Sequence, residues 1–215
     1  MKLIRRAVRA VSWFVSWLFE DLKQLYFPPK PPSLPEDRIP VNKRGVRDLS
    51  FYTEPLEHYI ELYNSFLATR WKGSTLEQRG LAWKQRVHGT NGLLVKGWEA
   101  LPFLLTLIRH SNPDAREDAY YLLGELRSDP AISEELLECL QNEKDLVARS
   151  AVIAALGKCR YRPAIPALRS IILGADVDVD TRWDAADSLG SIVGQDFSGP
   201  DKLAKAEAWL AAPEE

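Results

Sequence analysis

The chain has few of the residues from which metal centres and covalent cross-links are built. Its 215 residues include two cysteines and three histidines. Cys139 and Cys159 form no CxxC pair and fall at apolar positions of expected helices, so we interpret both as reduced core residues. His58, His88 and His110 belong to no metal-binding pattern, and no HExxH motif is present. We therefore expect no metal and no cofactor.

The sequence also lacks a large excess of charge and the motifs of common enzymes. Lysine and arginine number 28 against 30 aspartates and glutamates, a formal net charge of -2. A general nucleic-acid binder normally needs a strongly basic face, so we expect no nucleic-acid partner. There is no phosphate loop, no GxSxG motif and no glycine-rich dinucleotide turn. The sequence therefore favours a protein that is not an enzyme.

The apolar run near the N-terminus is too short to span a bilayer comfortably. It extends from Ala10 to Phe19, whereas a spanning helix needs about 20 apolar residues. Around it, residues 2–26 carry an apolar stripe in alternating steps of four and three, which predicts a helix. Four basic residues lie in its first turns, and its middle is aromatic. The residues expected to anchor this helix are Ile4, Val8, Val11, Trp13, Phe14, Val15, Trp17, Leu18 and Phe19.

Several targets for this helix, residues 1–27, remain open. A basic helix with aromatic residues at mid-length suits a membrane interface, and we expect attachment to a membrane or a membrane-protein complex, peripherally on the cytoplasmic side. The helix also suits a hydrophobic groove of a soluble partner, or pairing with a second copy. It could instead pack on its own domain. A signal peptide is less favoured, because no small-x-small cleavage site follows.

A proline-rich segment separates this helix from the rest of the chain. Prolines recur from Pro28 to Pro40 and favour an extended polyproline conformation at about 3 Å per residue. We interpret residues 28–50 as a semi-rigid linker; an SH3-type ligand is the alternative.

Residues 51–92 are predicted to form a helical pair. The first helix starts after Pro55, and a capping box, Thr75 with Gln78, is expected to start the second. The second helix is expected to stop at Gly89, before a turn at Asn91-Gly92. This pair could be a degenerate repeat, with Arg79 and Ala82 in the repeat's arginine and alanine places.

The central feature is a fragment that recurs three times. Arg116, Arg149 and Arg182 stand 33 residues apart, and each is followed eight residues later by a glycine that a leucine precedes. Self-similarity at this period is typical of helical repeat arrays. We therefore predict an all-α fold, a right-handed α-solenoid of three to four helix pairs. Three repeats occupy residues 93–197, and a C-terminal capping helix occupies residues 198–215.

These repeats resemble the HEAT repeats, specifically the short HEAT-like repeats of the phycobilisome-lyase type. The shared pattern is an Asp, a turn, a Val-Arg-like pair, an Ala and a terminal Leu-Gly. It is clearest here as Asp145, Ala148-Arg149, Ala151 and Leu156-Gly157. The tail Val193 to Phe197 is similar to a Gly-Gln-Asp-Phe ending common after bacterial HEAT-like arrays. The resemblance implies the solenoid fold, but the family includes adaptors, assembly factors, chromophore lyases and DNA glycosylases.

Two sets of repeat residues are candidates for distinct roles. An Asp or Asn four residues before each arginine can cap the second helix of its pair and accept hydrogen bonds from arginines. We interpret this set as a structural ladder rather than an anion site. The second helices also expose aromatic and charged residues that suit a concave partner surface. The ladder is Asn112, Arg116, Asp145, Arg149, Asp178 and Arg182, and the surface is Glu117, Tyr120, Tyr121, Trp183 and Asp187.

The function expected from these observations is that of a non-enzymatic adaptor or accessory subunit. The N-terminal helix would attach it to a membrane or membrane-protein complex, and the repeats would bind or brace another protein. The resemblance also implies an alternative, a bilin (tetrapyrrole) lyase or chromophore chaperone. A HEAT-like DNA glycosylase is disfavoured by the acidic charge balance.

Overall fold

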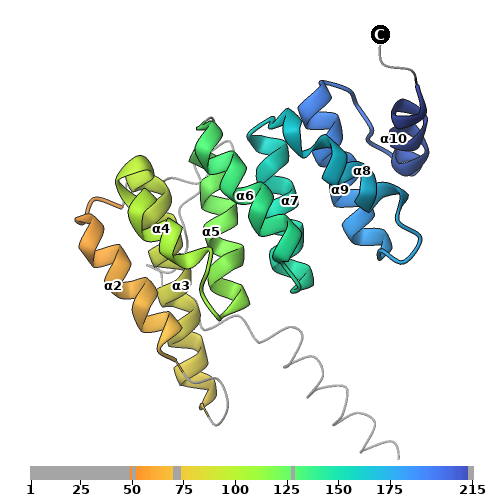
Figure 1. Ribbon diagram of the computed structural model, residues 1–215. Coiled ribbons are helices and arrows are strands. Elements are labelled where there is room, and N and C mark those ends of the chain that lie inside the picture. Colours follow the sequence, from red (N-terminus) through yellow and green to blue (C-terminus); the bar gives the residue numbers. More distant parts are fainter. Residues whose placement is uncertain (1–48, 50–51, 70–73, 127–128, 213–215) are drawn as a thin grey trace, which may run out of the picture. The chain divides into compact units, whose positions relative to one another are not determined.

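The computed structural model describes residues 49, 52–69, 74–126 and 129–212, and within these ranges the chain is built from helices without strands (Figure 1). Apart from Leu49, they belong to one compact unit, Ser50–Glu215. The anchor helix predicted for residues 1–27 and nearly all of the linker predicted for residues 28–50 lie outside the described residues.

The helices follow one another as pairs. Short 3-10 turns, Gly97–Ala100 (η2) and Arg162–Ala164 (η3), lead into α4 and α8. The helices are α2 (Leu56–Leu67), α3 (Leu76–Lys96), α4 (Leu101–Leu107), α5 (Pro113–Leu126), α6 (Pro130–Asn142), α7 (Leu146–Lys158), α8 (Ile165–Leu173), α9 (Val179–Val193) and α10 (Lys202–Ala211).

Each pair packs its second helix against the second helix of the next pair. The pairs are α2 with α3, α4 with α5, α6 with α7, and α8 with α9. The second helices α3, α5, α7 and α9 contact one another in that order, while α10 packs on α8 and α9 (Figure 1). This arrangement is an α-solenoid, as the sequence predicts. Because α3 stands beside α5 as α5 stands beside α7, the pair α2–α3 continues the stack at its N-terminal end.

The glycines at the ends of the repeats allow the second helices to approach closely. A Cβ atom added to Gly124 would lie 2.9 Å from the Cα atom of Ala155 in α7. One added to Gly157 would lie 2.8 Å from the Cα atom of Ser188 in α9. Both neighbours are backbone atoms that cannot move away alone. The glycine of the repeated Leu-Gly ending is therefore explained by the close contact between successive helix pairs.

The prediction for the second helix of residues 51–92 was wrong at its C-terminal end. The capping box of Thr75 and Gln78 is present, but α3 continues through Gly89 and Gly92 to Lys96. The two glycines are places of close approach to α2: a Cβ at Gly92 would overlap the Tyr59 ring at 2.1 Å. Asn91 is buried and its side-chain amide donates to the Tyr52 hydroxyl at 3.0 Å. Asn-Gly is thus used for packing here, not for a turn.

The close approach of Gly157 to α9 can be tested by substitution. Alanine is normally more stable than glycine inside a helix by about 1 kcal/mol. At this site we expect Gly157→Ala to lower the free energy of unfolding by about 1–3 kcal/mol, because its methyl group would overlap the backbone of α9. Urea unfolding followed by circular dichroism measures the change. Ala154→Ser, on the exposed face of the same helix, should change it little. A stabilised Gly157→Ala variant would contradict the packing described.

Candidate functional site

The residues four positions before the repeat arginines lie at the starts of the second helices. Asp145 Oδ1 accepts hydrogen bonds from the backbone N–H groups of Val147 and Ala148, both at 3.0 Å. Asp178 accepts from the N–H group of Thr181 at 2.8 Å. Asn112 Oδ1 accepts from the N–H group of Asp114 at 3.0 Å. Each side chain thus satisfies donors that a helix start leaves unpaired.

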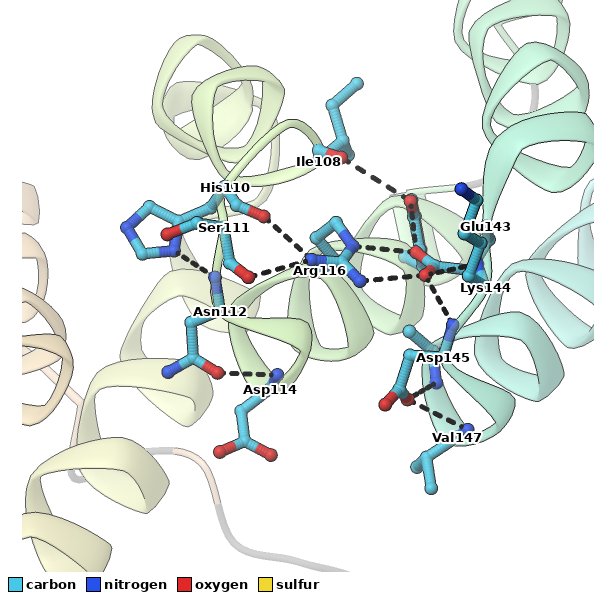
Figure 2. A network of polar contacts seen from close by, with 12 residues as sticks. Ile108, His110, Ser111, Asn112, Asp114, Arg116, Glu143, Lys144, Asp145 and Val147 are labelled. Atoms are coloured by element: carbon cyan, nitrogen blue, oxygen red, sulfur yellow. Dashed lines mark hydrogen bonds and ion pairs between the residues drawn. The ribbon is translucent and has the colours of Figure 1, made fainter. Parts of the chain in front are cut away.

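Arg116 connects the α4–α5 pair to the α6–α7 pair (Figure 2). Its Nε and Nη2 atoms donate to the two carboxylate oxygens of Glu143 at 2.7 and 2.8 Å. Its Nη1 atom donates to the carbonyls of His110 and Ser111, in the turn before its own helix. The guanidinium group therefore ties the turn before α5 to the turn before α7.

Glu143 is the buried centre of this network. Its side chain is 2% exposed and accepts hydrogen bonds from the backbone N–H groups of Lys144 and Asp145. The Tyr120 hydroxyl donates to it at 3.1 Å. The hydrogen bonds from Arg116, more than any other cause, lower the pKa of Glu143 to about 2. The carboxylate is therefore charged at neutral pH, and its charge is compensated on several sides.

The other two repeat arginines differ from Arg116 and from each other. Arg182 donates to the Ile172 carbonyl at 2.8 Å and to Glu207 of α10 at 2.9 Å. The Nε atom of Arg149 is buried and has no hydrogen-bond partner. The arginines of the predicted ladder therefore do not make equivalent contacts. Arg116 pairs with Glu143, in the turn after α6, and Arg182 pairs with Glu207 of α10. Arg149 makes no ion pair among the described residues.

The arginine that joins α3 to α5 is Arg86. Its Nε and Nη2 atoms donate to the two oxygens of Asp118 at 2.7 and 3.0 Å, and Nη2 also donates to Glu117 at 2.7 Å. The Tyr63 hydroxyl of α2 donates to Asp118 at 2.7 Å. Arg79 lies four residues after the N-cap Thr75 and donates to the Ser74 carbonyl, as Arg116 does to the Ser111 carbonyl, but it is exposed and makes no ion pair among the described residues. Arg86 lies outside the 33-residue register, so no sequence signal indicated it.

The predicted partner surface needs one correction. Tyr120 is 1% exposed and donates its hydroxyl hydrogen inward, so it belongs to the core. Its neighbour Tyr121 is 37% exposed, and Trp183 is 41% exposed. The 33-residue register places Ser150 and Ala154 of α7 between the corresponding residues of α5 and α9. We define the second-helix surface as Glu117, Tyr121, Ser150, Ala154, Trp183 and Asp187.

A lysine from a neighbouring helix contacts each of the two exposed aromatic rings of this surface. The Lys158 ammonium lies 4.4 Å from the centroid of the Tyr121 ring and pairs with Glu125. The Lys202 ammonium lies 5.5 Å from the centroid of the Trp183 ring and pairs with Asp187. An exposed aromatic ring with a fixed orientation loses little entropy when it is buried by a partner. Lys202 comes from outside the repeats, so the sequence did not indicate its contact.

A pocket of about 280 Å³ lies beside the Arg116 network, between the end of α4 and helices α5 and α6. Its charged groups are mostly paired with one another, Arg109 with Glu135 and Arg116 with Glu143. Cys139 also lines it, and burial raises the pKa of this thiol. Both cysteines are free, as expected for reduced residues, and both are half-buried at the margin of the core.

The described residues show neither an evident metal site nor a membrane-spanning helix. They contain no cluster of three or more histidine, cysteine or acidic side chains placed to hold a metal ion. None of their helices has the length and apolar character needed to cross a membrane.

Comparison with known proteins agrees with the architecture. The family model for HEAT repeats matches residues 91–157 and again residues 133–215, together more than half of the chain. The chain therefore belongs to the HEAT-repeat family. HEAT repeats generally mediate protein–protein interactions, and a scaffold role follows for this chain at that level. No curated protein and no solved structure gave a significant match.

The low pKa of Glu143 predicts an acid-dependent loss of stability. A carboxyl group with a pKa lowered from 4.5 to about 2 stabilises the fold above pH 4.5, and this contribution is lost as the pH falls toward 2. We expect Glu143→Gln to cost about 2 kcal/mol of unfolding free energy at pH 7, and the difference from the wild type to shrink below pH 4.5. Urea unfolding at several pH values measures this. Glu138→Gln, at an exposed position of α6 just before Glu143, serves as control. A pH-independent difference would contradict the prediction.

Proposed function

We propose that this chain is a non-enzymatic adaptor or accessory subunit that binds a partner protein through its second-helix surface. The observation that supports this most directly is the pair of exposed rings, Tyr121 and Trp183, each held by a cation. Aromatic side chains with restricted motion carry much of the binding energy in protein interfaces. They stand on α5 and α9, on either side of α7, so that one partner segment can contact both rings.

The small side chains between them support the same role. Ser150 and Ala154 of α7 are half-buried and exposed, respectively, and neither would hold a partner away from the helix backbone. Large rings beside small residues provide contact area together with room for the partner's own side chains. The pocket next to Arg116 is a weaker candidate, because its charges already have partners within the chain.

The second part of the proposal concerns residues 1–27. We propose that this basic and aromatic segment attaches the protein to a membrane or a membrane-protein complex, on the cytoplasmic side. Its sequence supports this: arginines and a lysine precede a cluster of Trp and Phe residues. The proline-rich residues 28–50 would then separate the attachment point from the repeats, so that the repeats can reach a second protein.

Partner binding is tested by cross-linking in cells. A photoreactive phenylalanine analogue placed at position 183 should cross-link one protein, and Tyr121→Ala should remove most of that product. Loss of one buried aromatic contact typically weakens binding by about 2 kcal/mol or more, a factor of about thirty. Placement at exposed Glu134 of α6 is the control and should give no such product. Equal cross-linking from both positions would contradict the proposed surface.

Attachment is tested by removing residues 1–27. We expect the full chain to sediment with membranes or with a large detergent-stable complex, and the truncated chain to remain in the supernatant. Thermal unfolding of the truncated chain checks that the repeats are intact. An unchanged fractionation would rule out this role for the segment. A tetrapyrrole that copurifies with the full chain would favour the chromophore-lyase alternative instead.

A further inference from the structure

Three acidic residues of α5 bind a guanidinium group in this structure. Arg86 pairs with Asp118 at 2.7 Å and with Glu117 at 2.7 Å, and its Nη1 atom lies 3.6 Å from Asp114. The carboxylates occupy positions i, i+3 and i+4 of the helix, so they share one face. The Arg86 guanidinium also lies 5.6 Å from the centroid of the Trp83 ring. Carboxylates and an aromatic ring thus surround one cationic group.

The same three positions recur in α9 after two steps of the repeat. Asp114, Glu117 and Asp118 correspond to Asp180, Trp183 and Asp184, each 66 residues further along. Two carboxylates are kept, and an aromatic ring replaces the third acidic residue. A carboxylate pair beside a tryptophan suits arginine, because its planar group can bind carboxylate through a fork of donors and stack on the ring.

No cation of the described residues occupies this second set. Asp180 and Asp184 make no ion pair and no side-chain hydrogen bond within the described ranges. The two cationic residues of α7 do not supply one: Lys158 pairs with Glu125, and Arg149 makes no ion pair among the described residues. Lys202 lies near the Trp183 ring, but its ion pair is with Asp187. The α9 set therefore repeats the chemistry of the Arg86 site without its own arginine.

Unpaired negative charge at the neighbouring helix positions is confined to α9. The registers of Asp114, Glu117, Asp118, Tyr121 and Glu125 in α5, α7 and α9 hold seven carboxylates, and five of these have an ion pair: Arg86 with Asp114, Glu117 and Asp118, Lys158 with Glu125, and Lys202 with Asp187. The other two, Asp180 and Asp184, have none among the described residues. The carboxylates lie on α5 and α9, while α7 between them is small and neutral apart from Lys158. Val147 at its start is 60% exposed and offers an apolar contact. A segment with an apolar stripe over α7 and an arginine on the side of α9 would match both features.

We infer that Asp180, Trp183 and Asp184 bind an arginine side chain of a partner protein, carried on an amphipathic segment that lies along α7. This inference rests on the proposed function, since it assigns a chemistry to the partner of the second-helix surface. The two carboxylates accept hydrogen bonds from the guanidinium group, and the indole ring contacts its flat face. Asp180 is exposed, Asp184 is half-buried and Trp183 is 41% exposed, so the group is reached from solvent.

The test uses the full chain and fluorescently labelled helical peptides of about five turns. Each peptide carries an apolar stripe of alanine and leucine, and the residues beside this stripe are arginine in one peptide and citrulline in the other. Citrulline has nearly the shape of arginine without its charge. Fluorescence anisotropy at fixed ionic strength should show the arginine peptide binding about tenfold more tightly than the citrulline peptide. In Asp180→Asn/Asp184→Asn, this preference should fall to about twofold or less. Glu134→Gln/Glu138→Gln on α6 changes the net charge equally and should keep the preference.

The outcomes separate this inference from the proposed function. If citrulline binds as tightly as arginine, or if the arginine preference survives in Asp180→Asn/Asp184→Asn, the arginine site is wrong. When the cross-link at position 183 still forms and still depends on Tyr121, the proposed function stands without it. A second copy of the chain as the occupant would appear as a dimer in sedimentation that the two asparagine substitutions dissociate, and that result also overturns the inference.

Discussion

The close contact between successive second helices is the constraint on which the rest of the structure depends. A helix pair of this size cannot bury its apolar surface alone, so each pair is stable only when stacked on its neighbours. The stack forms because Gly124 and Gly157 let α5, α7 and α9 meet backbone to backbone. That spacing also brings the cation of one helix over the aromatic ring of the previous one, as with Lys158 and Tyr121. Packing therefore creates the surface.

Polar networks at the turns complement this apolar packing. A buried ion pair contributes little net stability by itself, because desolvation of its two charges offsets their attraction. Arg116 and Glu143 are instead satisfied on several sides by turn carbonyls, backbone N–H groups and Tyr120. Any other stacking of the two helix pairs is strongly disfavoured, because it would leave the buried Glu143 charge without its hydrogen-bond partners. Its main effect is to define how one pair sits on the next.

The variation among equivalent positions carries more functional information than the repetition itself. Asp145 and Asp178 both cap helices, and nothing beyond the local backbone is needed to explain them. By contrast, one register holds Asp118, Ala151 and Asp184, of which Asp118 binds Arg86 while Asp184 has no ion pair among the described residues. Asp184 thus keeps a residue type whose intramolecular partner is absent, and this difference is the basis of the arginine site that we infer. The same comparison distinguishes exposed Tyr121 from the buried Tyr120 beside it.

The sequence by itself determined the helical repeats, their caps and their register. These features are local: an N-cap, a helical stripe and a 33-residue period need only nearby residues and direct counting. It also indicated Glu117, Tyr121, Trp183 and Asp187 as candidates for a partner surface, and that role is a proposal.

The tertiary structure alone decided the features that depend on rotation about a helix axis or on contacts between distant segments. One residue turns a side chain by about 100°, which is enough to bury Tyr120 and expose Tyr121. Packing against α2 carries α3 through Asn91-Gly92, since Tyr59 fills the space that the missing Gly92 side chain leaves. Arg86 meets Asp118 across 32 residues and a change of register, and Lys202 reaches Trp183 from outside the repeats. The local sequence pattern indicates neither the Arg86–Asp118 contact nor the Lys202–Trp183 contact, because each forms only when the helices are stacked.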